Sequence, residues 1–299
     1  MRNREKICAI LVTYNRKELL IEALNGLINQ TKKLDGIYII DNASTDKTPE
    51  LLLEKEFIKK LPPQKLKNPW ESENIKSDIS IFYLRMDKNS GGAGGFYEGM
   101  KRGYEKGFDW LWLMDDDVEP LPNTLETQLK YKNISSCIHP SKKFLNKDNF
   151  RWNGYICEKY GVVISLEENF KDKGFTCINY GCFEGMLINR DIVEKIGFPD
   201  KEFFIAGDDA FYGYKASKFT NVIYIKDALF LKKIKKDPKN KSSKYLYFVN
   251  RNFTYFLMKI SKRKYITFFY RLLIAIENSF RYRAFAPLIG FKDGIRGKF

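Results

Sequence analysis

Four short, largely apolar runs, separated by stretches with helical spacing, constrain the fold of this chain more than any other feature. The runs are Ile7–Thr13, Ile37–Ile40, Ile79–Leu84 and Asp109–Met114. Each is short enough to be a strand that is buried on both faces of a sheet. Apolar residues recur at helical spacing in the segments 17–29, 51–58 and 95–106. This strand–helix alternation predicts an α/β fold, with a mostly parallel sheet and flanking helices.

The segments outside these elements are less regular. The polar stretch 62–78 contains three prolines and is predicted to be a surface loop. A helix is expected near residues 209–218, and a basic, aromatic and mostly helical region from about residue 244. We therefore divide the chain into a sheet-bearing domain, residues 1–243, and a helical C-terminal region, residues 244–299.

The positive charge of the chain is concentrated at its C-terminal end. Residues 232–299 hold 18 Lys and Arg against 3 Asp and Glu, which accounts for the whole net charge of +15. Such a block attracts a polyanion, either nucleic acid or an anionic membrane surface. No apolar run is long enough to predict a membrane-spanning helix. The five cysteines form no CxxC pair and are interpreted as reduced thiols in a cytosolic protein.

An aspartate triplet, Asp115–Asp117, follows the fourth predicted strand directly. Three adjacent carboxylates repel one another unless a cation or hydrogen-bond donors neutralise them. A divalent cation, Mg²⁺ or Mn²⁺, with oxygen ligands and a bound diphosphate removes that cost. The alternative is a solvated acidic turn. Thr13, Asp41 and Asn89 also fall at strand ends, where parallel sheets bind ligands, and this convergence favours the metal.

A glycine-rich stretch, Asn89–Phe96, precedes the triplet and opens a predicted helix. Glycines leave bare backbone N–H groups, and a helix N-terminus favours anions. The stretch is neither a P-loop nor a dinucleotide-binding fingerprint. We interpret it as a cradle for a sugar diphosphate, with a flexible turn as the alternative.

A second acidic motif, Gly207-Asp208-Asp209, precedes the helix expected near residue 209. One of its carboxylates could be a general base whose pKa is tuned by its neighbour. The alternative is an N-cap at Asp208 followed by a first-turn aspartate, and both interpretations can hold together. His139 is the only histidine, and so histidine-based catalysis and zinc binding are not expected.

Five motifs occur together in the order seen in one enzyme family. They are Leu11–Arg16, Asp41–Asp46, Asn89–Gly92, Asp115–Asp117 and Gly207–Asp209. As a set they resemble the inverting glycosyltransferases of family 2, which have the GT-A fold, over about residues 6–252. The segments 89–96, 203–209 and 245–252 look most like those of bacterial galactofuranosyltransferases, with rhamnosyltransferases next.

The resemblance implies a role for each matching residue. Asp115 and Asp117 would bind Mn²⁺ or Mg²⁺, and Asp209 would be the catalytic base with Asp208 beside it. Glu184 is a further substrate-binding candidate, and Glu184 or Asp208 is the alternative base. The other residues implied to bind substrate are Thr13, Tyr14, Arg16 and Asp41 at the base and ribose, Asn89, Gly91 and Gly92 at the diphosphate and sugar, and Asp116 near the ribose or sugar.

The chain departs from the family pattern at one position. Many relatives carry a metal-binding histidine on the strand after the Gly-Asp-Asp helix, and the matching stretch here, Ala228–Lys232, contains none. Either water completes the metal shell, or Lys232 or Lys233 partly replaces the charge. The departure bears on metal affinity and on how strictly the enzyme depends on metal.

The resemblance, which for the donor rests on residues 89–96, implies an inverting hexosyltransferase that moves galactofuranose from UDP-galactofuranose to a glycan hydroxyl. The resemblance implies an acceptor carried on a polyprenyl diphosphate lipid, in the synthesis of a cell-surface polysaccharide such as capsule. The alternatives are a rhamnosyltransferase that uses dTDP-rhamnose, a nucleic-acid-binding protein, and an inactive family member that acts as a scaffold. Nucleic acid is not the expected partner, because residues 1–231 carry no net charge.

The C-terminal region is predicted to dock the enzyme peripherally on the cytoplasmic face of the cell membrane. Aromatic and basic residues are interleaved from Tyr245 to Arg271, which is the make-up of an interfacial helix. The alternative is that the aromatic residues form a core or the interface of a homo-oligomer, and that the lysines form a solvated face.

Overall fold

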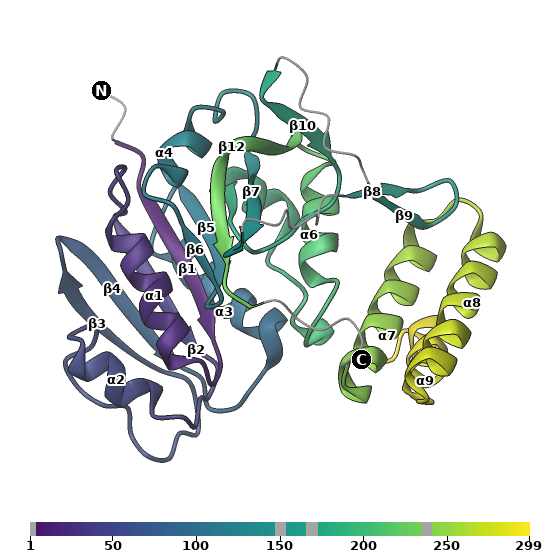
Figure 1. Cartoon of the computed structure of the whole chain (residues 1–299), viewed down its shortest axis with the longest axis horizontal. Helices are drawn as coiled ribbons and strands as arrows, with labels where there is room; N and C mark the ends of the chain where they lie inside the picture. Colours follow the sequence, from purple (N-terminus) through teal and green to yellow (C-terminus); the bar gives the residue numbers. More distant parts are fainter. Residues whose placement is uncertain (1–3, 147–153, 166–172, 235–240) are drawn as a thin grey trace.

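The structure, a computed structural model, describes residues 4–146, 154–165, 173–234 and 241–299. Figure 1 shows a large sheet with helices packed against it and three C-terminal helices gathered at one side of the molecule. The predicted α/β architecture with a helical C-terminal region is confirmed.

The strands alternate with helices in the first part of the chain and follow one another more closely after β5. The strands are β1 (Ile7–Thr13), β2 (Gly36–Asp41), β3 (Trp70–Lys76), β4 (Ile79–Arg85), β5 (Trp110–Asp115), β6 (Val118–Pro120), β7 (Cys137–Phe144), β8 (Gly154–Cys157), β9 (Val162–Ser165), β10 (Phe175–Ile178), β11 (Met186–Asn189) and β12 (Val222–Lys232). The helices are α1 (Lys17–Ile28), α2 (Thr48–Glu54), α3 (Gly91–Glu105), α4 (Thr124–Leu129), α5 (Arg190–Ile196), α6 (Asp208–Ala216), α7 (Ser243–Ile260), α8 (Lys264–Tyr282) and α9 (Ala286–Arg296).

The main sheet of the described residues has the strand order β10-β12-β7-β11-β5-β1-β2-β4-β3, with β6 paired to β12. Strands β5, β1, β2 and β4 are mutually parallel, as are β7 and β12. Antiparallel pairs lie at the β3 edge and where β11 joins β5 to β7. The parallel block is the part in which the sequence shows strand–helix alternation.

Strand β1 illustrates why the strand sequences are continuously apolar. Alternate side chains point to opposite faces of a strand, and here both faces are covered. Leu11 belongs to a buried cluster with Leu24 of α1, whereas Ile10 belongs to another with Met100 of α3. The polar residues at the ends of these strands are therefore left to build the rim of the sheet.

The sequence predicts a surface loop over residues 62–78, and this prediction is wrong for residues 70–76. They form β3, which pairs antiparallel with β4 at the edge of the sheet. An edge strand of this kind keeps one side open to water and tolerates polar residues. Trp70 anchors it, because its ring packs edge-on against Tyr83 with 6.2 Å between the ring centroids.

Helix α3 begins at Gly91, four residues earlier than the sequence predicts, because most of the glycine-rich stretch is itself helical. A Cβ atom at Gly95 would lie 2.6 Å from Val12 Cγ1, and one at Gly99 would lie 2.4 Å from Ile10 Cγ2. Glycine costs helix propensity, but here it lets α3 lie directly on β1. Some of the glycines that drew attention in the sequence therefore serve the close packing of α3 on β1.

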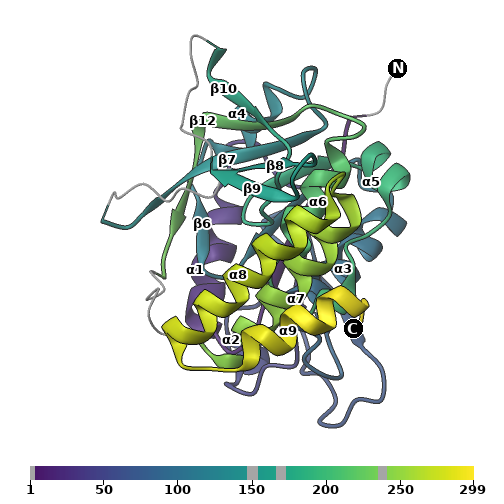
Figure 2. The ribbon, with the colours of Figure 1, turned by 90° about the vertical axis from the view of Figure 1, so that its right-hand side faces the viewer.

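The C-terminal helices form layers outside α6. Phe256 of α7 shares a buried cluster with Phe203 and Phe211, and the rings of Phe211 and Phe256 are stacked. Helix α9 lies close against α7, since a Cβ atom at Gly290 would sit 2.3 Å from the Tyr247 carbonyl oxygen. Figure 2 shows α8 and α9 on the outer side. Within the described part of the chain, no helix is both long and apolar enough to span a membrane.

Candidate active site

A cavity of about 630 Å³ opens where β1 and β5 end and where α3 and α6 begin. All the residues predicted from the sequence for the site line this cavity, with the exception of Asp41. The walls also include Asn42, Tyr180 and Tyr245, which sequence reasoning missed. Segments far apart in the sequence therefore meet at one edge of the sheet, as expected for a parallel α/β fold.

Asp116 fixes the loop that follows β1. Its carboxylate accepts hydrogen bonds from the Thr13 hydroxyl at 2.8 Å and from Arg16 Nη1 at 2.9 Å. The same Arg16 guanidinium lies 3.3 Å from Asp117 Oδ2. Burial raises the pKa of Asp116, while Arg16 and Thr13 act in the opposite direction. In the structure the middle aspartate of the triplet is thus bonded to protein donors.

Asp41 lies behind the cavity wall. It is fully buried, and its carboxylate accepts hydrogen bonds from the Tyr83 hydroxyl at 2.7 Å, Arg85 Nη1 at 2.5 Å and the Ser44 N–H at 2.8 Å. These bonds hold the turn after β2, where the neighbouring Asn42 reaches the cavity. A contact between Asp41 and a nucleotide stays a prediction.

Three carboxylates converge at the end of β5. Oxygen atoms of Asp115, Asp117 and Glu184 all lie within 4.8 Å of one another. Glu184 precedes β11, the antiparallel neighbour of β5. Burial, and then the charges of Glu184 and Asp117, raise the pKa of Asp115 to about 8. Crowded carboxylate oxygens are the donors that Mg²⁺ and Mn²⁺ prefer, and so these residues fit the predicted metal.

Two buried lysines border this carboxylate cluster. Lys232 of β12 donates hydrogen bonds to Asp117 Oδ1 at 2.6 Å and to Glu184 Oε1 at 2.5 Å. Lys142 of β7 donates to Glu184 Oε2 at 2.9 Å. Burial alone would raise the pKa of Glu184, but the two ammonium groups lower it to about 2. Lys233, the other lysine considered from the sequence, pairs instead with Glu22 and Glu119, neither of which lines the cavity.

The start of α3 presents backbone to the cavity. Gly91 has a φ of +73°, and a Cβ atom there would lie 2.0 Å from the Phe204 carbonyl oxygen. At Gly92 no heavy atom of the described residues, apart from its chain neighbours and its own helix backbone, lies within 4 Å of the Cβ position, which leaves room for a ligand. Asn42 braces this turn, because its Nδ2 donates to the Gly91 carbonyl oxygen at 2.8 Å and its Oδ1 accepts from the Ser90 N–H at 2.9 Å.

Asp208 and Asp209 occupy the first turn of α6. The N-cap is Gly207, with a φ of +89°, and so the interpretation of Asp208 as the N-cap is wrong. Glycine is favoured at this position because its φ is positive. Burial and the Asp209 charge raise the pKa of Asp208. Burial also raises the pKa of Asp209, to about 6, although the Ala210 N–H and the Lys142 charge act against it.

Two tyrosines lie near Asp209. Burial and the charge of Asp209 raise the pKa values of both Tyr180 and Tyr245. Tyr245 comes from α7, and so the C-terminal helices contribute to the cavity wall. A single tyrosine in a loop, such as Tyr180, carries no local sequence signal. Lys142 gave no signal either, because it stands within a strand.

His139 lies outside the cavity lining. Its Nε2 accepts a hydrogen bond from the Cys182 N–H at 3.3 Å, and burial lowers its pKa to about 3. A buried neutral imidazole of this kind has a structural role.

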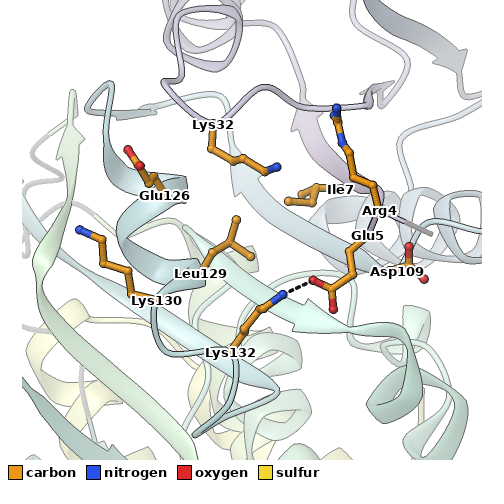
Figure 3. A pocket seen from close by; sticks show the side chains of 9 residues that line it. All are labelled: Arg4, Glu5, Ile7, Lys32, Asp109, Glu126, Leu129, Lys130 and Lys132. Atoms are coloured by element: carbon orange, nitrogen blue, oxygen red, sulfur yellow. Dashed lines mark hydrogen bonds and ion pairs between the residues drawn. The ribbon is translucent and has the colours of Figure 1, made fainter. Parts of the chain in front are cut away.

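A second cavity, of about 870 Å³, lies at the opposite ends of the same strands, beside Ile7 and Asp109 (Figure 3). Its rim mixes basic and acidic side chains, and Lys132 pairs with Glu5 at 2.5 Å across it. None of the residues predicted for the site lines it. Although it is the larger cavity, none of the charged side chains that line it is buried.

With this geometry in place, the comparisons with known proteins define the class of protein. The sequence model of glycosyltransferase family 2 matches residues 8–197, and the chain belongs to this family. Its fold is GT-A-like.

Particular relatives are named galactofuranosyltransferase GlfT1. The chain is 28% identical to the Mycolicibacterium smegmatis protein over 216 residues, which cover 70% of this chain and 64% of the relative. It is 27% identical to the Mycobacterium tuberculosis H37Rv protein over 209 residues, which cover 69% of this chain and 62% of the relative. The chain thus spans a little under two thirds of the length of these curated relatives.

Solved structures support the fold. Staphylococcus aureus TarS 1–349 in complex with UDP matches with a TM-score of 0.56 at 12% identity, covering 92% of this chain and 72% of that one. GalNAc-T7 with UDP, GalNAc and Mn²⁺ matches with a TM-score of 0.63 at 13% identity, covering 99% of this chain and 55% of that one. At these identities the likeness concerns the fold alone.

Proposed function

We propose that this enzyme transfers galactofuranose from UDP-galactofuranose to a glycan hydroxyl with inversion at the anomeric carbon. The observation that carries the proposal is the arrangement of the cavity. A carboxyl group with a raised pKa, Asp209, lines the same cavity as the cluster formed by Asp115, Asp117 and Glu184. The cavity thus combines a proton acceptor with a place suited to a cation and a diphosphate.

Asp115 and Asp117 would hold Mn²⁺ or Mg²⁺, and Glu184 is placed to add a third carboxylate. The bound ion would supply Lewis-acid stabilisation of the leaving diphosphate. Gly92 would present its backbone N–H to the diphosphate at the start of α3, and Gly91, whose N–H donates to Asn89 Oδ1 at 2.8 Å, would shape the turn beside it. Thr13, Tyr14 and Arg16, with Asp41 behind them, would hold the base and ribose, Asn89 would lie near the sugar, and Asp116 would order this loop.

Asp209 is the proposed base. The acceptor oxygen attacks the anomeric carbon as the bond between that carbon and the diphosphate oxygen breaks on the opposite face. The acceptor proton passes to the Asp209 carboxylate. A pKa of about 6 leaves Asp209 ionised at neutral pH and makes it a better proton acceptor than an ordinary aspartate. The charge of Glu184 also raises the pKa of Asp209, and Asp208 beside it is the alternative base.

The choice of donor rests on the relatives named galactofuranosyltransferase and on the resemblance of residues 89–96. We would test it by incubating the protein with Mn²⁺ and a panel of nucleotide sugars and by measuring released nucleotide diphosphate. UDP-galactofuranose should give the fastest release. Faster turnover of dTDP-rhamnose would identify a rhamnosyltransferase, and release from none of the sugars would contradict the proposal.

We further propose that residues 244–299 form a membrane-facing region, which brings the site to a polyprenyl-diphosphate-linked acceptor at the cytoplasmic face. Tyr265, Phe269, Leu273 and Phe280 of α8 are all more than half exposed and recur near helical spacing. Residues 241–299 hold 13 Lys and Arg against 2 Asp and Glu. Exposed apolar side chains beside basic ones suit an anionic lipid surface.

A further inference from the structure

Lys232 stands inside the proposed metal centre. It is buried, with 4% of its surface exposed, and its ammonium group bonds two of the three carboxylates that could hold an ion. The role of Lys232 there rests on the proposed function, in which Asp115, Asp117 and Glu184 face a nucleotide diphosphate.

The two carboxylates bonded by Lys232 already have a cationic partner at each oxygen. Asp117 Oδ1 is bonded by Lys232, and Asp117 Oδ2 lies 3.3 Å from Arg16 Nη1. Glu184 Oε1 is bonded by Lys232, and Glu184 Oε2 by Lys142 at 2.9 Å. A divalent ion that binds these residues must share their oxygens with fixed positive charges.

We propose that Lys232 is a resident cation of this centre: it holds Asp117 and Glu184 together without metal, and it keeps the affinity for a free divalent ion low. The reason is electrostatic. A fixed ammonium group a few ångströms from the ion repels it in an environment where charges are poorly screened. The same ammonium group would attract a diphosphate, whose charge offsets that repulsion. Lys232 is thus a positioning residue for the carboxylates as well as a source of positive charge.

The test measures Mn²⁺ binding directly, by calorimetry or by the loss of the free Mn²⁺ resonance, in the absence of nucleotide. Lys232→Gln removes the charge and keeps an amide that can donate to Asp117 or Glu184. We expect it to bind Mn²⁺ about tenfold more tightly or better than the parent protein. Mn²⁺ should also raise the Tm of Lys232→Gln more than that of the parent, because an ion bound only by the folded state stabilises it.

Two further variants serve as controls. Lys232→Arg keeps the charge and should retain the weak binding of the parent. Lys233→Gln removes the neighbouring lysine, which pairs with Glu22 and Glu119 outside the cavity. This variant should bind Mn²⁺ as the parent does. If Lys232→Gln does not fold, Lys232→Met takes its place, and we expect the same gain in Mn²⁺ affinity.

The proposal is overturned if neutral variants at position 232 bind Mn²⁺ no more tightly than the parent, or if Lys233→Gln gains as much. It is also overturned if the parent already binds free Mn²⁺ as tightly as the neutral variants. UDP binding and release of UDP from UDP-galactofuranose by the parent are measured separately. Failure of those two assays would count against the proposed function, whereas the Mn²⁺ series decides the role of Lys232.

Discussion

The two cavities lie at opposite ends of β1 and β5 and differ in how charge is arranged around them. At the carboxyl ends, the side chains of Lys142 and Lys232 are 0% and 5% exposed and neutralise only part of a carboxylate cluster. At the amino ends, Lys132 and Glu5 are 40% and 43% exposed and pair with each other. The carboxyl groups with raised pKa values, Asp115, Asp116, Asp208 and Asp209, all line the smaller cavity, and such groups are a better guide to chemistry than cavity size.

The sharpest way to break this comparison is to remove the proposed base. Asp209→Asn should lower the rate of sugar transfer by about 10²–10⁴-fold, because the acceptor proton loses its acceptor. UDP affinity, measured by calorimetry, should stay at the parental value. Normal transfer by this variant would move the role to Asp208 or Glu184.

The pH dependence of turnover tests the same group without changing its size. Because the raised pKa of Asp209 is about 6, the ionised base is present above that pH and is lost below it. We expect kcat to fall roughly tenfold per pH unit below about pH 6. This limb should be absent from the residual activity of Asp209→Asn, and its persistence there would assign it to another group.

An aspartate at each end of β5 gives a matched pair. Asp117→Asn should lower turnover about a hundredfold or more and weaken its dependence on Mn²⁺, because a proposed metal ligand is lost. Asp109 at the other end accepts a hydrogen bond from the Lys6 N–H at 2.7 Å, and Asp109→Asn should keep turnover close to the parental value. Parental turnover and metal dependence in Asp117→Asn would mean that the metal site is misassigned.

The sequence was most informative where several residues follow buried strands. Strand ends predict one rim, and the structure brings Thr13, Asn89 and Asp115–Asp117 to it, with Asp41 behind the cavity wall. The edge strand β3 escaped prediction because its polar residues resemble those of a loop. Lys142 could not be predicted either, since only the pairing of β7 with β11 and β12 brings this strand lysine near Glu184.

Of the two cavities, α7 lines only the smaller one. The outer face of α8, the helix that follows α7, is the surface proposed to face the membrane, and it can be tested in the same way. Phe269 and Leu273 are 61% and 66% exposed, so that replacing both by serine should leave the fold intact. We expect affinity for anionic vesicles to fall about tenfold or more in co-sedimentation, since two apolar side chains are lost. Ile75→Ser, at a 71% exposed position of β3, should change nothing. Equal binding by the double variant and Ile75→Ser would argue against this face.

The smallest effect is expected at the amino-end cavity, and it is the one most able to overturn the comparison. Lys132→Met removes the pairing with Glu5, and an exposed ion pair contributes about 0–1 kcal/mol to stability. The Tm should therefore shift little, and turnover of UDP-galactofuranose should stay within about twofold of the parent, because no perturbed carboxyl group or nucleotide-binding residue depends on Lys132. The measurement is a thermal melt and a kcat/KM determination beside the parent and Asp117→Asn. If Lys132→Met lost activity on the scale of Asp117→Asn while keeping its Tm, the larger cavity would take part in turnover. Buried charged groups would then have identified only one of two regions that the reaction needs.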